Sequence, residues 1–202
     1  MRILFLTALV FLGLHVLPAH ARDLNPDALK AQNYLRDLKT AKADFIQRSS
    51  LGGRLSGTFY LDRPGRLRFE YNEVGDFIVA DGFFIYFYDS QMEEQTNAPI
   101  GQTLADFLLR KDLTFQDDLV VQETYRKGGY SFVTLVQEDD PQAGSVQLIF
   151  SEIPYALRKW RVTDPQGETT EIELKNMERD IDLPNTLFGY LDPNKGKKRF
   201  ND

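Results

Sequence analysis

The stretches RPGRLRFEY (residues 63–71) and FFIYFYD (residues 83–89) decide the fold class that the sequence predicts. In the first, Leu67, Phe69 and Tyr71 occupy alternate positions with charged residues between them, a pattern typical of a strand with one apolar face. The second is apolar or aromatic at six consecutive positions, so neither face of such a strand would be polar. A one-sided antiparallel sheet needs only one apolar face. The sequence therefore predicts a sheet with a second apolar surface.

The chain begins MRILFLTALVFLGLHVLPAHARDL, which has the layout of a secretory signal peptide. Arg2 precedes a run of apolar residues, and the small-residue motif AHA follows that run. We predict a signal peptide over residues 1–21, cleaved after Ala21, and a single domain over residues 22–202 outside the cytoplasm. The apolar run is too short for the alternative, an N-terminal membrane anchor.

Composition excludes several classes of function. The chain has 24 basic and 30 acidic residues, and an exported acidic protein is a poor candidate for binding nucleic acid or anionic lipid headgroups. Cysteine is absent, so the protein has no disulfide and cannot itself be a bacterial lipoprotein, whose lipid is attached to an N-terminal cysteine. Both histidines, His15 and His20, lie in the predicted signal peptide. The sequence thus argues against catalysis by Ser-His-Asp or Cys-His, and we expect no metal and no cofactor.

The remaining pattern predicts a mainly β, α+β chain. Asn25 as N-cap and Pro26 as first residue open an amphipathic helix that ends near Thr40. A second helix is expected over residues 104–110. Short strands are expected over residues 43–49, 54–62, 66–71, 77–80, 83–88, 119–126, 130–137, 145–152, 157–163 and 169–176. Such a sheet curves strongly, and either fills its concave side or leaves room there for a ligand beneath helices.

Candidate chemical sites are few. Glycoside hydrolysis needs two carboxyl groups that face each other, but sequence neighbours on a strand point to opposite faces. Solvated loop charge is the better interpretation of the three acidic pairs, Glu93-Glu94, Asp117-Asp118 and Asp139-Asp140.

Basic and aromatic residues are also ambiguous on local grounds. Arg66 and Arg68 are expected on a solvated strand face, and Trp160 is expected to serve in packing. Arg63 differs because it lies at a turn, where a guanidinium can cap the carbonyl groups of a helix C-terminus or of a neighbouring loop. A surface arginine without partners is the alternative.

The segments AKADFIQ, GTFYLDRPGRLRFEY, IVADGFFIYFYD, LADFLL and DPQGETTEIEL, in this order, resemble the LolA family of periplasmic outer-membrane lipoprotein carriers. The resemblance implies an incomplete antiparallel β-barrel with a lid of short α-helices over an apolar cavity that holds acyl chains. It also implies that the arginine before the proline of the RP turn, Arg63, tethers the lid. The residues it implies for the cavity and lid are Leu35, Leu38, Phe59, Leu61, Leu67, Phe69, Tyr71, Ile85, Phe87, Leu104, Phe107 and Leu108.

The function implied is that of a soluble periplasmic carrier, not an enzyme, that shuttles lipoproteins from the inner to the outer membrane. Its partners would be acylated lipoproteins as cargo, an inner-membrane lipoprotein-releasing ABC transporter and an outer-membrane acceptor lipoprotein, and we expect a monomer. Shielding is needed because exposing a chain of roughly fifteen methylenes to water costs on the order of 10 kcal/mol. A general binding protein for fatty acid, phospholipid or glycolipid is the alternative, and a carboxylate-dependent hydrolase is a third hypothesis.

Overall fold

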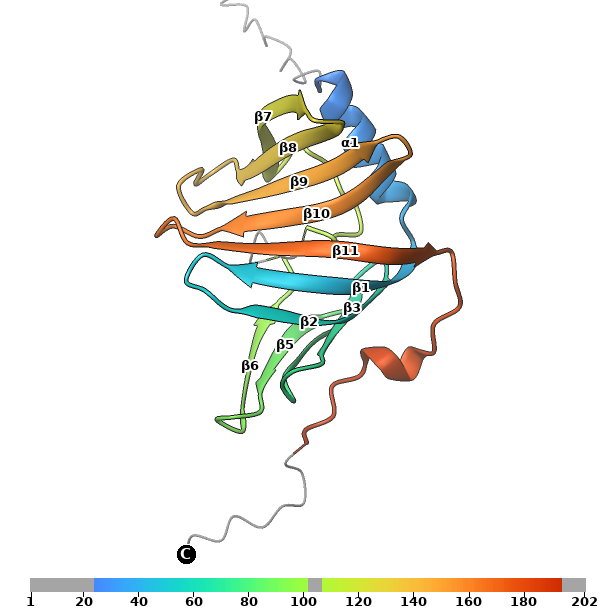
Figure 1. Cartoon of the computed structure of the whole chain (residues 1–202), viewed down its shortest axis with the longest axis vertical. Helices are drawn as coiled ribbons and strands as arrows, with labels where there is room; N and C mark the ends of the chain where they lie inside the picture. Colours follow the sequence, from blue (N-terminus) through green and yellow to red (C-terminus); the bar gives the residue numbers. More distant parts are fainter. Residues whose placement is uncertain (1–23, 102–106, 194–202) are drawn as a thin grey trace, which may run out of the picture.

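The computed structural model describes residues 24–101 and 107–193, and within them one antiparallel sheet of 11 strands dominates (Figure 1). The strand order is β6-β5-β4-β3-β2-β1-β11-β10-β9-β8-β7, so the first and last strands of the chain pair in the middle of the sheet. The strands are β1 (Thr40–Ser49), β2 (Arg54–Asp62), β3 (Arg66–Tyr71), β4 (Phe77–Asp81), β5 (Phe84–Asp89), β6 (Glu94–Pro99), β7 (Leu119–Lys127), β8 (Tyr130–Gln137), β9 (Ser145–Glu152), β10 (Tyr155–Thr163) and β11 (Thr169–Arg179).

The sheet does not close, because β6 and β7 remain its two edges. The expected mainly β fold is confirmed in this form: an open antiparallel sheet with one short N-terminal helix among the described residues. The predicted signal peptide lies outside the described residues, and so does the first half of the helix expected over residues 104–110. The described part of that segment, residues 107–109, forms turns. Within residues 24–101 and 107–193, no helix is both long and apolar enough to cross a membrane.

Helix α1 (Pro26–Asp37) begins as its sequence predicts. The side chain of Asn25 accepts a hydrogen bond of 2.8 Å from the backbone nitrogen of Asp27, and Pro26 needs no such bond because it has no N–H group. The helix ends at Asp37, earlier than expected, because Leu38 adopts an extended backbone and leads into β1. Its buried face packs on β7 and β8.

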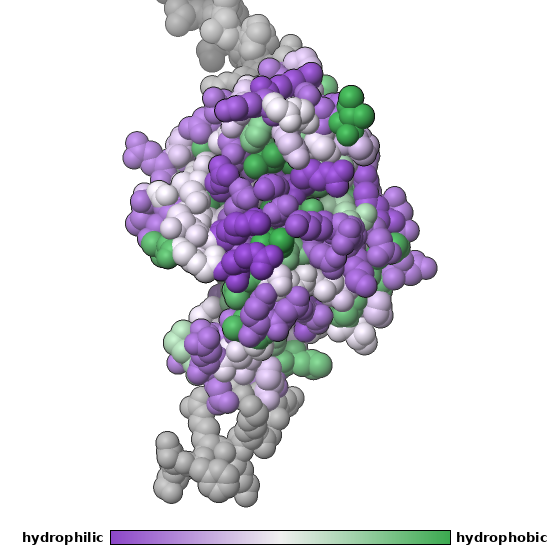
Figure 2. Space-filling model, viewed as in Figure 1, coloured by the Kyte–Doolittle hydropathy of each residue, from purple (hydrophilic) through white to green (hydrophobic). Residues whose placement is uncertain are grey.

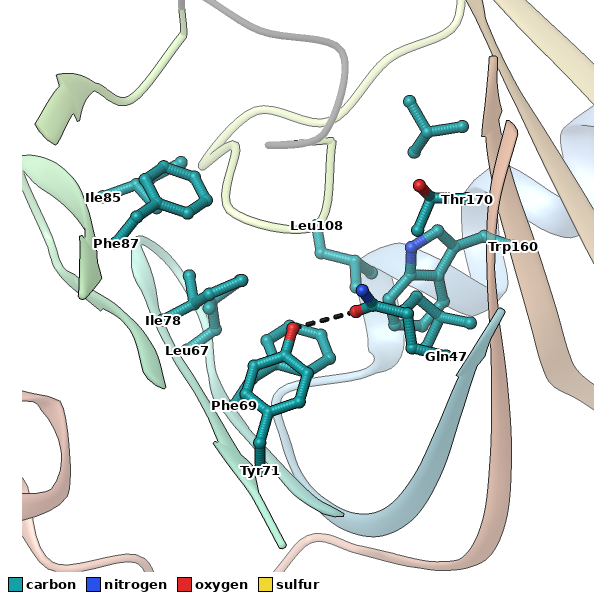
Figure 3. A pocket seen from close by; sticks show the side chains of 12 residues that line it. Gln47, Leu67, Phe69, Tyr71, Ile78, Ile85, Phe87, Leu108, Trp160 and Thr170 are labelled. Atoms are coloured by element: carbon teal, nitrogen blue, oxygen red, sulfur yellow. Dashed lines mark hydrogen bonds between the residues drawn. The ribbon is translucent and has the colours of Figure 1, made fainter. Parts of the chain in front are cut away.

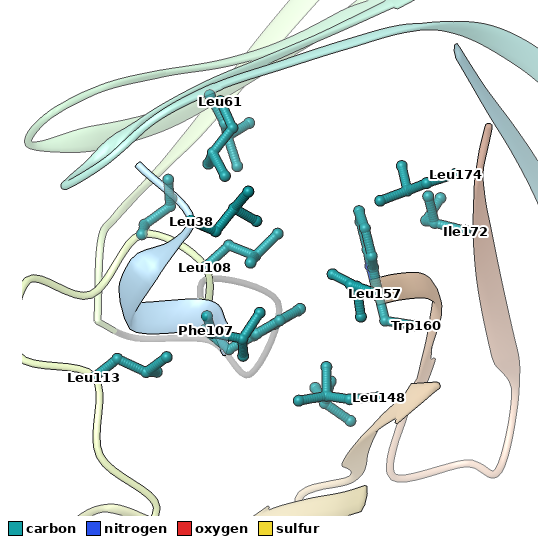
Figure 4. Close-up of a cluster of buried hydrophobic side chains, with 14 of the residues drawn as sticks. Leu38, Leu61, Phe107, Leu108, Leu113, Leu148, Leu157, Trp160, Ile172 and Leu174 are labelled. Carbon is teal, nitrogen blue, oxygen red and sulfur yellow. The ribbon is translucent and has the colours of Figure 1, made fainter. Parts of the chain in front are cut away.

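The core lies between α1, the segment after residue 107 and the inner face of the sheet (Figure 4). Figure 4 shows Leu38, Leu108 and Phe107 on one side of this cluster, facing Leu157 and Trp160 on the other. Buried leucine and aromatic side chains of this kind each contribute about 1.5–3 kcal/mol to folding when removed from water. A chain without cysteine has no disulfide, so this core must supply its stability.

The opposite face of the central strands is polar (Figure 2). Glu171 and Glu173 of β11 alternate with the buried Ile172 and Leu174 and form ion pairs with Arg48, Lys159 and Arg161 of the neighbouring strands. Exposed ion pairs contribute little to stability, typically below 1 kcal/mol each. Their effect here is to keep one face of β1, β10 and β11 hydrated, so that the apolar face turns inward.

A β-bulge changes the side-chain pattern of β10. The pairing with β9 shifts register between Leu157 and Lys159, so one extra residue lies in β10. Because of this extra residue, Leu157 and Trp160 are both buried although they are three positions apart. An uninterrupted strand would place residues at that spacing on opposite faces.

Strand β5 has a buried side chain on each of its two faces, as the apolar run FFIYFYD predicts. Ile85 is 5% exposed and lies in the main core, whereas Tyr88 stacks on Phe77 at 5.1 Å on the other face. On that second face, Tyr86 also stacks on Tyr190 of the C-terminal segment, with ring centroids 4.7 Å apart. The segment that contains the 3-10 helix η2 (Asn185–Phe188) therefore covers part of the outer surface.

The C-terminal segment also changes the surroundings of two arginines that were expected to be solvated. Arg66 donates a hydrogen bond of 2.7 Å to the side-chain oxygen of Asn185, and its guanidinium lies 5.4 Å from the ring centre of Phe188. Arg68 donates to the backbone oxygen of Leu187 at 3.4 Å and lies over the ring of Phe77. These side chains hold η2 against β3 and β4.

Candidate ligand cavity and the arginine beside it

An apolar cavity of about 270 Å³ lies against the inner face of the sheet (Figure 3). Side chains from six strands line it, and Leu108 contributes from the segment after residue 107. In Figure 3, Leu67 and Ile78 lie across the cavity from Gln47 and Trp160. The full lining is Gln47, Leu67, Phe69, Tyr71, Ile78, Ile85, Phe87, Leu108, Trp160, Val162, Thr170 and Ile172.

Six of the expected cavity residues line this space: Leu67, Phe69, Tyr71, Ile85, Phe87 and Leu108. In β3 and in β5 these residues occupy alternate positions, so they share one face of each strand. The face of β5 that turns inward is therefore the one with Ile85 and Phe87. Five others lie in the packed core and not on the cavity wall, each 1% exposed or less: Leu35, Leu38, Phe59, Leu61 and Phe107. Leu104 lies outside the described residues.

Sequence patterns did not indicate the part of the cavity wall that β1, β10 and β11 provide, nor Ile78 of β4. Trp160, expected only to pack, both packs and lines the cavity. Val162 and Ile172 come from strands near the C-terminus, and Ile172 is opposite Gln47 in the β1–β11 pairing. The sequence signal for this part of the wall was the two-residue spacing of Phe45 and Gln47, and of Thr170 and Ile172, which places each pair on one face of its strand. That signal shows which residues share a face of a strand but not which strands meet.

Aromatic rings form the base of the cavity. Phe69 contacts Phe45 at 5.0 Å and Phe59 at 4.9 Å, and Trp160 lies 5.9 Å from both Phe59 and Phe107, all measured between ring centroids. Most of these contacts are edge-to-face, the arrangement that aromatic pairs favour. Phe69 and Trp160 are thus held in the cavity wall by contacts with other aromatic rings of the core.

Gly57 makes this aromatic packing possible. It lies in β2 between Phe45 of β1 and Tyr71 of β3, whose rings meet across it at 5.2 Å. A Cβ atom at Gly57 would overlap the backbone oxygen of Glu70 and lie 2.7 Å from Cε1 of Phe45. Glycine is required because any side chain would displace either the ring or the neighbouring strand.

One hydrogen bond crosses the cavity wall. The hydroxyl of Tyr71 donates to the side-chain oxygen of Gln47 at 2.8 Å (Figure 3). Burial, with a smaller effect from the charge of Asp76, raises the pKa of Tyr71 to about 12. Tyr71 is thus a neutral donor at physiological pH, and it orients the amide of Gln47.

A second, more polar pocket of about 450 Å³ adjoins the cavity and shares Gln47, Tyr71, Ile78 and Phe87 with it. Asp76, Asp89 and Glu94 line this outer pocket, together with Met92, which is 67% exposed. The two spaces together form a path from an acidic rim into an apolar interior. Their combined size falls in the range of pockets that bind small organic ligands.

Arg63 connects the turn after β2 to two other parts of the chain. Its guanidinium donates one hydrogen bond to the backbone oxygen of Leu35, near the end of α1, and a second, of 2.7 Å, to the backbone oxygen of Arg110. Burial, and to a smaller extent the charge of Arg36, lowers the pKa of Arg63. The group is nevertheless cationic at neutral pH, because a free arginine has a pKa above 12.

The backbone of the same turn strengthens this connection. The nitrogen of Gly65 donates to the oxygen of Leu109 at 2.9 Å, and the nitrogen of Arg63 donates to the oxygen of Lys39 at 2.8 Å. Helix carbonyl groups near a C-terminus carry partial negative charge and favour a cation. The turn thus holds the end of α1 and residues 108–110 together, and Leu108 of that segment lines the cavity.

Comparison with known proteins supports the family expected from the sequence. The family profile described as outer membrane lipoprotein carrier protein LolA matches residues 36–190. The outer-membrane lipoprotein carrier protein of Methylococcus capsulatus is 27% identical over 81% of this chain and 83% of its own length. That of Legionella pneumophila strain Paris is 29% identical over 91% of this chain and 95% of its own length.

A solved structure shares the fold. A DUF1329 family protein from Desulfovibrio piger superposes with a TM-score of 0.51 at 12% identity, over 81% of this chain and 95% of that one. The profile match covers more than half of the chain, and it spans the cavity and Arg63. The chain therefore belongs to the LolA family of outer membrane lipoprotein carrier proteins, a family of carriers and not of enzymes.

Proposed function

We propose that this protein carries lipoproteins through the periplasm by holding their acyl chains in the cavity between β3, β5 and β11. The observation that supports this proposal most directly is the chemistry of the wall, in which nine of the twelve lining residues are aliphatic side chains, phenylalanine or tryptophan. An acyl chain of roughly fifteen methylenes gains on the order of 10 kcal/mol from leaving water, so an apolar wall alone can hold it.

The lid in this proposal consists of the end of α1 and the segment 104–110. Arg63 tethers it, since one guanidinium donates to the backbone oxygens of both Leu35 and Arg110. Leu108, two residues before Arg110, lines the cavity, so release of the segment would open one side of the binding space. In this proposal, the conformation in which Arg63 forms both of these hydrogen bonds is the closed state of the carrier.

The same proposal assigns the partners. An inner-membrane lipoprotein-releasing ABC transporter would load the carrier, and an outer-membrane acceptor lipoprotein would receive the cargo. The cargo must leave again, and this favours a cavity with few polar contacts and a movable cover over tight polar recognition.

Native mass spectrometry of the mature chain tests this proposal. The protein is mixed with a purified triacylated lipoprotein, with the same lipoprotein after enzymatic removal of its acyl chains, and with phospholipid. We expect a one-to-one complex with the acylated form alone. A general lipid-binding protein would bind phospholipid equally well, and absence of any complex would refute the carrier function.

A further inference from the structure

Three of the twelve side chains that line the cavity are polar. Gln47 comes from β1, Tyr71 from β3 and Thr170 from β11, and all three line the cavity. Gln47 is opposite Ile172 in the β1–β11 pairing, which places Thr170 two residues further along the same face. Among the residues that the structure describes, neither the amide nitrogen of Gln47 nor the hydroxyl of Thr170 forms a hydrogen bond within the protein.

The amide of Gln47 has a defined orientation. Its oxygen accepts the hydrogen bond of 2.8 Å from Tyr71, so its nitrogen, with two hydrogens, remains as the free donor. This nitrogen and the hydroxyl oxygen of Thr170 both remain accessible to solvent, so a ligand that displaces water from them must offer them a hydrogen-bond partner in return. The free groups that line this wall are therefore donors suited to an acceptor on a ligand.

The position of Gln47 and Tyr71 defines which part of a ligand they would meet. Both residues line the apolar cavity and also the outer pocket, so they lie where the two spaces join. A ligand with its hydrocarbon chains in the inner cavity would place the first polar atoms of its head at this junction. In an acylated glyceryl group those atoms are ester carbonyl oxygens, which only accept hydrogen bonds.

The charges around the junction indicate which headgroup the ligand can have. Among the residues that the structure describes, no lysine or arginine lines either space, whereas Asp76, Asp89 and Glu94 line the outer pocket. Like charges within a few ångströms repel, so a phosphate headgroup at this rim is disfavoured. An acylated glyceryl thioether on a cysteine has the ester groups of a phospholipid but no phosphate.

We infer that the Gln47 amide, oriented by Tyr71, donates a hydrogen bond to an ester carbonyl of the diacylglyceryl group on the cargo and so sets the depth of its acyl chains. This inference rests on the proposed carrier function. It adds a polar anchor to a cavity that otherwise recognises only hydrocarbon, and it gives the cavity a preference for uncharged acylglyceryl heads.

The test compares two synthetic lipopeptides. One has an N-acetylated cysteine with an S-[2,3-bis(palmitoyloxy)propyl] group, and the other replaces both esters by hexadecyl ethers, which removes the carbonyl oxygens but keeps the chains. Dissociation constants are measured for the wild-type mature chain, for Gln47→Leu and for Gln95→Leu. Gln95 is exposed in β6 and lines neither pocket, so it serves as the matched control.

We expect the wild type and Gln95→Leu to bind the ester roughly 2- to 10-fold more tightly than the ether, the range of one net hydrogen bond. Gln47→Leu should lose this preference and bind the ester and the ether with equal affinity, and this binding also shows that the variant is folded. Tyr71→Phe should lose part of the preference, because the amide then rotates freely.

The outcomes that would contradict the role of Gln47 differ from those that would contradict the carrier function. Equal binding of ester and ether by the wild type, or an unchanged preference in Gln47→Leu, would overturn the inference while leaving the carrier function intact. Failure of the wild type to bind either lipopeptide would refute the carrier function itself.

Discussion

Arg63 and Leu35, which belong to the turn after β2 and to helix α1, are joined by a hydrogen bond from the guanidinium to a backbone carbonyl oxygen. The same guanidinium also reaches the backbone oxygen of Arg110. One side chain thus connects the sheet, the helix and the segment that contributes Leu108 to the cavity. A substitution of Arg63 should therefore affect the transfer of cargo without preventing its binding.

Arg63→Leu should loosen the end of α1 and residues 107–110 while the sheet stays folded. Hydrogen bonds from a charged group contribute about 1.5–3 kcal/mol each, so local opening should become at least tenfold more frequent. Hydrogen exchange of the amides in both segments measures this change. Acylated cargo should still load, but its transfer to acceptor membranes should fail.

The matched variants for this experiment are Arg63→Lys and Arg54→Leu. Lysine keeps the charge but cannot hold two carbonyl groups in a planar fork, so we expect an intermediate effect. Arg54 is exposed at the start of β2, and its replacement should leave exchange unchanged. Wild-type exchange and transfer in Arg63→Leu would rule out the tether.

Gly57→Ala should destabilise the protein by about 2–3 kcal/mol, the usual cost of overpacking a core. The new Cβ atom would overlap the backbone oxygen of Glu70 and press on the ring of Phe45, so β2 and β3 must move apart. Urea unfolding measures the loss. The control is Gly189→Ala, where no atom lies within 4 Å of the new Cβ and the backbone φ is −91°, and it should change stability by less than about 0.5 kcal/mol.

The hydroxyl of Tyr71 should make stability fall at alkaline pH. Its pKa is raised from an ordinary value of 10.0 to about 12 in the folded chain. A raised pKa means that the folded state holds the proton more tightly, so the contribution is complete below pH 10 and is lost as pH rises toward 12. Two pKa units correspond to an effect on the order of 3 kcal/mol.

The measurement compares the free energy of unfolding of the wild type and of Tyr71→Phe at pH 8 and pH 11. Phenylalanine has no proton to lose, so the wild type should lose more stability over this interval than the variant. Parallel pH profiles for the two proteins would contradict the burial of this hydroxyl against the cavity.

Trp160, the single tryptophan of the chain, should report occupancy of the cavity directly. It is 6% exposed and lies beside Ile172 and Phe69 on the cavity wall. An acyl ligand with bromine atoms along its chain should therefore quench the indole fluorescence on contact, whereas the bromine-free ligand should not. Binding without quenching would mean that the chains lie elsewhere on the protein.

Tyr86 and Tyr190 should be coupled energetically, because their rings stack at 4.7 Å with an interplanar angle of 10°. A double-mutant cycle with alanine at both positions should give a coupling of about 0.5–1.5 kcal/mol. Tyr125, which stacks on Phe132 in the distant β7–β8 pair, provides the control. The changes in unfolding free energy from Tyr125→Ala and Tyr190→Ala should simply add. Additive effects of Tyr86 and Tyr190 would mean that the C-terminal segment does not brace the outer face of β5.

Local sequence determined much of the secondary structure of this protein. Strands β2, β3, β8 and β9 begin and end where alternation and turn residues predict, because a period of two and a Gly or Pro turn are local properties. The N-cap Asn25 and the turn position of Arg63 were visible for the same reason. The edge strand β6 was not, because its residues are mostly exposed and polar and it forms only through its pairing with β5.

Tertiary structure alone decided which surfaces meet. The pairing of β1 with β11 brings Gln47 opposite Ile172, although 125 positions separate them in the chain, and no local pattern contains that information. The bulge in β10 turns Trp160 toward the same cavity, and the C-terminal segment covers the second face of β5. Alternation specifies two faces for each strand, but long-range pairing and bulges determine which face becomes the wall of the cavity.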